Sequence, residues 1–148
     1  MNNFTEVDIL LVEDSPSDAE LTVRVLQKNH LTKKIKVVTD GEEALDFLFS
    51  RGLYKERSMN AVPRLVLLDL KLPVVNGLEV LKEIKSDERT KIIPVVVLTS
   101  SSEDMDIFKS YQLGVNSYIV KPVDFDIFNK AVLEVGMYWL FLNKSPFK

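Results

Sequence analysis

Short apolar runs recur along the chain and alternate with segments of helical pattern. Each run is rich in Val, Ile and Leu and lacks strict apolar–polar alternation, which is typical of parallel strands covered on both faces. The segments between the runs begin with capping residues such as Ser15 and Asp40, and they place apolar residues three or four positions apart, as in Met105, Phe108 and Tyr111. The predicted strands are residues 7–12, 35–39, 65–68, 94–99 and 117–120, and the predicted helices begin at residues 15, 40, 77, 102 and 124.

This order of elements predicts one α/β domain. Five consecutive β-α units favour a parallel sheet with helices on both faces. With right-handed crossovers, a flavodoxin-like, doubly wound five-stranded sheet in the order 2-1-3-4-5 is the economical arrangement. Residues 1–148 hold no repeat or long linker. We therefore expect a single domain with a flexible N-terminus at 1–6, a C-terminal extension at 137–148 and no output domain.

The last helix is expected to be extended. From Asp124 to residue 143 the pattern would give a helix of about 30 Å. Gly136 could end or bend this helix, because glycine costs about 1 kcal/mol relative to alanine. Residues 137–142 are apolar all round the helix, so one core cannot bury them all. They either cover the edge of their own domain or form a partner surface, and we favour the partner surface.

The composition excludes several classes of protein. The chain has 148 residues, a net charge of −3 and 46% hydrophobic residues, which is the profile of one ordinary soluble domain. The charge argues against a nucleic-acid-binding protein, which would show a basic face. No apolar stretch approaches the ~20 residues that cross a bilayer, and a signal peptide is lacking. Because there is no cysteine, disulfides and thiol chemistry are excluded. We expect a cytoplasmic protein without nucleic-acid or membrane partners.

Polar residues collect where the predicted strands end, which is the edge at which doubly wound sheets bind ligands. Because the first and third strands are neighbours in the predicted order, Glu13, Asp14 and Asp69 would share one pocket. Two unit charges 5 Å apart repel by roughly 3 kcal/mol at an effective dielectric of 20, and Lys121 supplies a single positive charge. Hard oxygen ligands then favour a bound divalent cation, Mg²⁺ or Mn²⁺, over zinc.

Each of these residues also has an ordinary explanation when it is taken singly. Glu13 and Asp14 could be the acids that open a helix, Asp69 could cap a loop, and Thr99 could cap the next helix. Lys121 could be a surface residue before a proline. Their coincidence at the ends of four strands is what favours a functional site.

The motifs at these strand ends resemble the receiver domain of response regulators in two-component signalling. The resemblance extends from about Asp8 to the last helix. Residues 50–64, residues 116–125 and Trp139-Leu140 are further similar to small stand-alone regulators that serve phytochrome-type histidine kinases. The matching motifs are Val12-Glu13-Asp14, Leu67-Leu68-Asp69 with Pro73 and Gly77 four and eight residues later, Leu98-Thr99-Ser100, and Tyr118-Ile119-Val120-Lys121-Pro122.

The resemblance implies a role for each acidic and basic position. Asp69 would accept a phosphoryl group from the phosphohistidine of a partner histidine kinase. Glu13, Asp14 and Asp69 would hold Mg²⁺ together with the backbone carbonyl of Lys71. Lys121 would neutralise charge on the phosphoryl group as it is transferred. Positioning and charge stabilisation are most of what phosphoryl transfer requires.

The resemblance also implies a conformational switch. Thr99 would supply a hydroxyl that moves to the phosphorylated aspartate, and Tyr118 would be the aromatic side chain that turns inward with it. Ser100 would leave room for the phosphoryl group, and Pro122 would follow a cis peptide that aims the preceding lysine into the pocket. Ser101 resembles a variable site that tunes hydrolysis, or it is a solvent-facing loop residue.

We therefore expect a signalling switch rather than an enzyme. It would pass its signal by protein contact or relay the phosphoryl group, and it would form a homodimer through the fourth helix, the fifth strand, the fifth helix and the tail. A haloacid-dehalogenase-like phosphatase would need an acid where Lys71 stands. A flavodoxin would need a phosphate-binding loop where Glu13 and Asp14 would repel phosphate. An unphosphorylated scaffold would have no need of the intact set of site residues.

Overall fold

The computed structural model describes residues 7–147, so the predicted flexible N-terminus at 1–6 lies outside the described residues. Five parallel strands form one sheet in the order β2-β1-β3-β4-β5, which confirms the predicted topology. The strands are β1 (Ile9–Val12), β2 (Ile35–Val38), β3 (Leu65–Leu68), β4 (Val95–Thr99) and β5 (Ser117–Val120).

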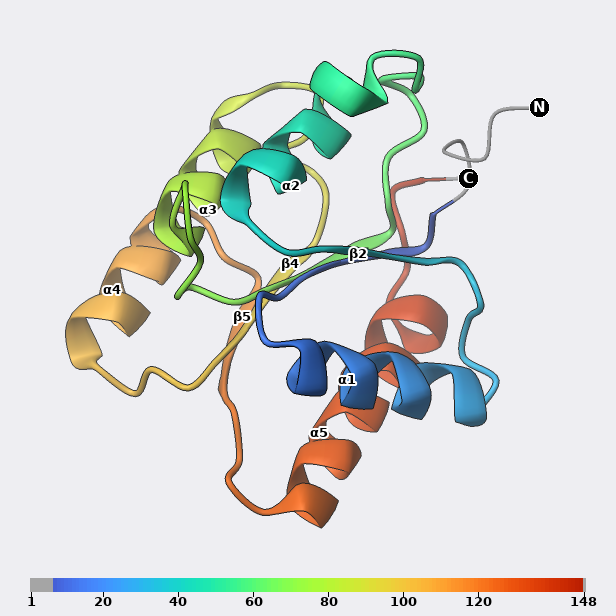
Figure 1. The fold of residues 1–148 in the computed structure, drawn as a ribbon, viewed down its shortest axis with the longest axis vertical. Helices are drawn as coiled ribbons and strands as arrows, with labels where there is room; N and C mark the ends of the chain where they lie inside the picture. The colour runs from blue at the N-terminus through green and yellow to red at the C-terminus, as the bar shows by residue number, and fades with distance from the viewer. Residues whose placement is uncertain (1–6, 148) are drawn as a thin grey trace.

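Helices cover both faces of the sheet, with α1 and α5 on one side and α2, α3 and α4 on the other (Figure 1). Each face therefore has its own apolar core, as expected for buried parallel strands. The helices are α1 (Pro16–Lys28), α2 (Gly41–Leu48), α3 (Gly77–Ser86), α4 (Asp104–Gln112) and α5 (Phe125–Met137), with a 3₁₀ turn η1 (Gly52–Tyr54) and a π-helical turn η2 (Tyr138–Leu142). Within residues 7–147, none of these helices is long and apolar enough to cross a membrane.

Strand register and helix capping fix the edge of the sheet where the polar residues lie. Val12 of β1 pairs with Leu68 of β3, so residues 13 and 69 leave the sheet side by side. Helix α1 begins directly after this edge because the Ser15 hydroxyl accepts a hydrogen bond from the backbone N–H of Asp18 at 3.3 Å. The predicted start of the first helix is thereby confirmed.

Helix α4 forms where it was predicted, but its apolar stripe points away from the core. Met105, Phe108 and Tyr111 are 59%, 58% and 54% exposed, and Ser110 is the only residue of α4 that is buried. The spacing identified the helix correctly. It did not indicate which side of the helix faces the sheet.

The C-terminal helix continues past Gly136 and changes to the π-helical turn η2 at Tyr138. A Cβ atom at Gly136 would lie 2.7 Å from side-chain carbons of both Leu26 and Leu31, so glycine here allows α5 to approach α1 closely. The Arg64 guanidinium donates to the backbone carbonyl of Leu140 at 2.7 Å and holds η2 against the domain.

The apolar tail covers its own domain in part, and its predicted role as a partner surface stays a prediction. Leu140 is buried and joins the core between the sheet and helices α1 and α5, so the tail does cover its own domain. Trp139 is half-buried against the same core, and four other large apolar side chains of the tail stay exposed. These are Met137, Tyr138, Phe141 and Leu142.

Candidate phosphoryl-acceptor site

The predicted acidic pocket is present at the carboxyl ends of β1 and β3. Glu13, Asp14 and Asp69 each place a carboxylate oxygen within 4.8 Å of the others. Glu13 and Asp69 are buried, whereas Asp14 is exposed. Three oxygen donors that converge from two adjacent strands, one of them open to solvent, are a set that suits a partly hydrated Mg²⁺ or Mn²⁺ ion.

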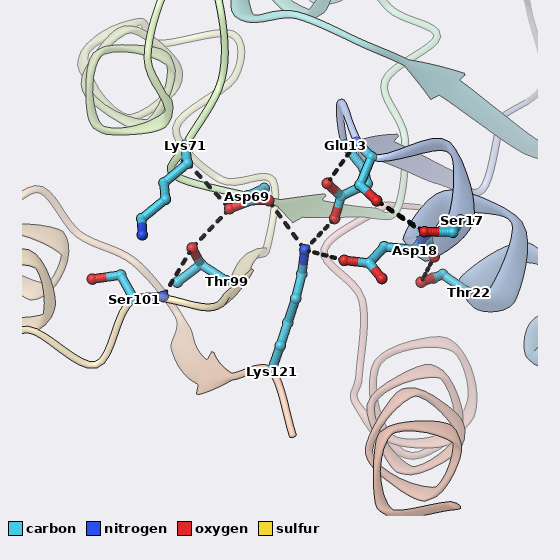
Figure 2. Close-up of polar contacts among 10 residues, drawn as sticks. Glu13, Ser17, Asp18, Thr22, Asp69, Lys71, Thr99, Ser101 and Lys121 are labelled. Atoms are coloured by element: carbon cyan, nitrogen blue, oxygen red, sulfur yellow. Dashed lines mark hydrogen bonds and ion pairs between the residues drawn. The ribbon is translucent and has the colours of Figure 1, made fainter. Parts of the chain in front are cut away.

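Lys121 reaches into this pocket from the end of β5. Its ammonium nitrogen Nζ donates to Glu13 Oε1 at 2.6 Å, to Asp18 Oδ2 at 2.9 Å and to Asp69 Oδ2 at 3.1 Å (Figure 2). The lysine side chain is 10% exposed. Lys121 therefore touches two of the three clustered acids directly.

Asp18 is the contact that sequence reasoning missed. Asp18 is the acid in the first turn of α1, a position that acids favour whether or not they have a partner. Its carboxylate nevertheless faces Lys121. The available signal was that Asp18 follows Asp14 closely along the chain. The first turn of a helix that begins at this edge of the sheet lies over the same pocket.

Burial and charge act differently on the two buried acids. Burial raises the pKa of Glu13 to about 7, and the hydrogen bond from Lys121 only partly opposes that rise. Burial also acts to raise the pKa of Asp69, but the hydrogen bond from Thr99 and the positive charge of Lys121 outweigh it, so the pKa of Asp69 is lowered. Asp69 is thus kept ionised, which a carboxylate nucleophile requires.

Lys121 remains a cation in this setting. Burial alone would lower the pKa of its amine, but the hydrogen bonds to Glu13 and Asp18 outweigh burial and raise the pKa above its ordinary value. A positive charge is therefore fixed beside Asp69 throughout the physiological pH range.

Neutral donors approach Asp69 from the opposite side. The Thr99 hydroxyl donates to Asp69 Oδ1 at 2.7 Å, and the backbone N–H of Lys71 donates to the same oxygen at 3.2 Å. Thr99 is fully buried. The predicted metal contact through the Lys71 carbonyl stays a prediction, because the contact that the structure shows is made by the Lys71 amide.

Ser101 joins the two predicted switch residues. Its N–H donates to the Thr99 hydroxyl at 3.4 Å, and its carbonyl accepts a hydrogen bond from the Tyr118 hydroxyl at 2.9 Å. Its own hydroxyl donates to Asp106 Oδ2 of α4 at 2.6 Å and points away from Asp69 (Figure 2). Ser101 is buried, so the interpretation as a solvent-facing loop residue is wrong. Ser100 is exposed, and its predicted role stays a prediction.

The prediction of a cis peptide at Pro122 is wrong. Within residues 7–147 the structure contains no cis peptide bond. The backbone N–H of Lys121 donates to the carbonyl of Thr99 at 2.7 Å, so the β4–β5 ladder sets the direction of the chain here. A trans bond, which X–Pro pairs prefer by about 0.5–1 kcal/mol, is sufficient to deliver Lys121 to the pocket.

Comparison with known proteins identifies the family. The model of the response regulator receiver domain matches residues 9–133, and the chain belongs to this family. It is 45% identical over 138 residues to the probable methanogenesis regulatory protein FilR2 of Methanothrix harundinacea, covering 93% of this chain and 86% of that protein.

Solved structures of phytochrome-associated regulators are similar in both fold and sequence. The chain is 41% identical over 132 residues to response regulator Rcp1 of Synechocystis, covering 89% of this chain and 88% of Rcp1. The Mn²⁺-bound form of Rcp1 superposes with a TM-score of 0.87 at 40% identity, covering 93% of this chain and 97% of that one. The phosphorylated cyanobacterial phytochrome response regulator RcpA gives a TM-score of 0.89 at 40% identity, covering 95% and 99%.

Proposed function

We propose that this receiver domain is a switch that is phosphorylated on Asp69 by a partner histidine kinase. The observation that carries the proposal is the environment of one carboxylate. Asp69 accepts hydrogen bonds from a lysine on one side and from a buried threonine on the other, and two further acids lie within 4.8 Å. A charged donor, a neutral donor and a set of metal ligands around one nucleophile are the parts that phosphoryl transfer needs.

The chemistry follows from these positions. A carboxylate oxygen of Asp69 attacks the phosphorus of the kinase phosphohistidine, the phosphorus–nitrogen bond breaks, and the histidine nitrogen keeps the bonding electrons. An acyl phosphate forms on Asp69. Lys121 offsets the charge of the phosphoryl oxygens, and Thr99 donates to the modified side chain. A divalent cation held by Glu13, Asp14 and Asp69 would reduce the repulsion between the carboxylates and the incoming phosphoryl group.

The relatives support both the cation and the kinase class. Rcp1 has been solved with Mn²⁺ bound, and RcpA has been solved in its phosphorylated form. We infer that the present chain is cytoplasmic and takes Mg²⁺ or Mn²⁺, and that its partner is a histidine kinase, with the phytochrome type as the first candidate. The output would be contact with another protein or onward transfer of the phosphoryl group.

A small phosphodonor tests the assignment without the kinase. Incubation with acetyl phosphate and Mg²⁺ should add one phosphoryl group, which intact-protein mass spectrometry detects, and chelation of the cation should prevent the addition. Asp69→Asn should abolish it, whereas Asp126→Asn, which changes an exposed aspartate in the first turn of α5, should not. Phosphorylation that persists in Asp69→Asn would overturn the site assignment.

We further propose that two copies associate through α4, β5 and α5. All three elements and the loop before α5 carry exposed large apolar side chains. Exposed patches of this kind are typical of protein–protein contact sites. The side chains are Met105, Phe108, Tyr111, Val120, Val123, Phe125 and Ile127.

A further inference from the structure

We propose that Asp18 is a positioning residue for Lys121 and keeps its amine beside Asp69 when a divalent cation is bound. This inference rests on the proposed phosphorylation of Asp69. An ammonium group has three N–H donors, and the donors of Lys121 have three acceptors, which are oxygens of Glu13, Asp18 and Asp69 at 2.6, 2.9 and 3.1 Å. Each N–H donor of the amine can therefore point to its own acceptor.

Asp18 differs from the other two acceptors because it is not one of the clustered acids. The three carboxylates that could hold a cation are Glu13, Asp14 and Asp69. A bound cation would draw on Glu13 and Asp69, which are two of the three acceptors of Lys121. Asp18 would then be the one acid that serves the lysine alone.

The backbone around Asp18 holds the residue in place independently of Lys121. Its N–H donates to the Ser15 hydroxyl at 3.3 Å, and its carbonyl accepts a hydrogen bond from the Thr22 hydroxyl at 2.8 Å. The Asp18 side chain is 35% exposed, against 10% for Lys121. A fixed acid at the rim thus anchors a long, buried side chain that would otherwise have several rotamers to choose from.

Without Asp18, Lys121 would depend on the oxygens that the cation needs. The Lys121 amine would either compete with the cation for Glu13 and Asp69 or move away from Asp69. Either outcome reduces the fraction of molecules in which the cation and the lysine flank Asp69 together. Phosphorylation should then slow, and cation binding should weaken even before any phosphodonor is added.

Two substitutions at Asp18 distinguish the effect of its hydrogen bond to Lys121 from the effect of its negative charge. Asp18→Asn keeps an oxygen that can accept from Lys121, whereas Asp18→Ala removes it. The initial rate with acetyl phosphate at saturating Mg²⁺ should fall about tenfold in Asp18→Ala, the size expected for one charge-assisted hydrogen bond, and should stay within about threefold of the parent in Asp18→Asn. Asp126→Ala, the same change in the first turn of α5, should leave the rate unchanged.

A double-mutant cycle tests the contact between Asp18 and Lys121 without phosphorylation. Asp18→Ala should weaken Mn²⁺ binding to the unphosphorylated protein by about threefold, measured by isothermal titration calorimetry. In a Lys121→Met background, the same substitution should leave Mn²⁺ affinity unchanged, because no amine remains to compete with the cation.

The outcomes distinguish this inference from the proposed function. The positioning role would be overturned if the phosphorylation rate fell equally in Asp18→Ala and Asp18→Asn. It would also be overturned if Asp18→Ala still weakened Mn²⁺ affinity in the Lys121→Met background. Either result would show that Asp18 acts through its charge. A parent-like Asp18→Ala in a protein that is phosphorylated on Asp69 would also overturn it while leaving the proposed function intact. If the parent protein itself takes no phosphoryl group, it is the proposed function that fails.

Discussion

Helices α3 and α4 are neighbours on the same face of the sheet, yet they are held there by different forces. Helix α3 inserts Val80, Leu81 and Ile84 into the core, and each of these side chains is fully buried. Helix α4 buries only Ser110, whose hydroxyl donates to the carbonyl of Asp106 within the same helix. Apolar packing therefore holds α3 more firmly than α4, in which Ile107 is half-buried and the single buried side chain is polar.

This difference fits the positions of the two helices relative to Asp69. Ser101 donates a hydrogen bond to Asp106 in the first turn of α4, and Ser101 also contacts Thr99 and Tyr118. The first turn of α4 is thus linked to both predicted switch residues. An element that buries little apolar surface can change position at low cost, and segments that move in regulation are drawn from such regions. Of the two helices, α4 is therefore the one with little apolar anchoring and a polar link to the site, and α3 is the more firmly packed.

The largest expected effect is the loss of packing in α3. Ile84→Ala removes a fully buried side chain and should lower the free energy of unfolding by about 2–5 kcal/mol. Met105→Ala, which shortens an exposed side chain of α4, should change it by no more than about 0.5 kcal/mol. Urea unfolding followed by circular dichroism measures both. Similar losses at the two positions would contradict the contrast between the helices.

A smaller and local effect is expected when the polar contact of α4 is removed. Ser101→Ala deletes the hydroxyl that donates to Asp106 at 2.6 Å, and it should lower the free energy of unfolding by about 1 kcal/mol. Amide hydrogen exchange should become faster in residues 104–112. Ser102→Ala, the same substitution at the exposed neighbouring residue, is the control. Unchanged exchange in residues 104–112 of Ser101→Ala would mean that this hydroxyl does not hold α4 in place.

The fold could be predicted because each strand and helix has a recognisable pattern of apolar residues within a short segment, and the order of these elements indicates the topology. Each parallel strand was visible as an apolar run, and strand order then placed Glu13 beside Asp69 without any knowledge of side-chain conformation. The observed β1–β3 register puts residues 13 and 69 together, so the acidic pocket was the part of the site that the sequence could define best.

The rest of the site could not be predicted because it depends on side-chain direction. Ser101 was interpreted either as a variable site that tunes hydrolysis or as a solvent-facing loop residue, and its burial depends on the placement of α4. Asp18 lies in the first turn of α1, where an acid also has an ordinary role at the helix start. The stripe of Met105, Phe108 and Tyr111 indicated a helix in either orientation. These choices are set by contacts between elements distant in the chain, and no local pattern encodes them.

The smallest effect on folding is expected on the exposed side of α4. Phe108 is 58% exposed, so Phe108→Ala should alter the free energy of unfolding by no more than about 0.5 kcal/mol. If α4, β5 and α5 form the proposed homodimer, the same substitution should weaken self-association about tenfold or more, which corresponds to about 1.4 kcal/mol. Sedimentation equilibrium of the parent and the variant measures this.

Leu53→Ala provides the matched control for Phe108→Ala, because Leu53 is 88% exposed but lies in η1, outside the proposed interface. It should leave self-association unchanged. Weakening by both substitutions would indicate nonspecific apolar association, and weakening by neither would place the dimer elsewhere or exclude it. Weakening by Phe108→Ala alone would show that the stripe of α4, which is exposed in the single chain, is covered by a second copy. The helix with the least packing inside its own domain would then obtain its apolar contacts from the partner.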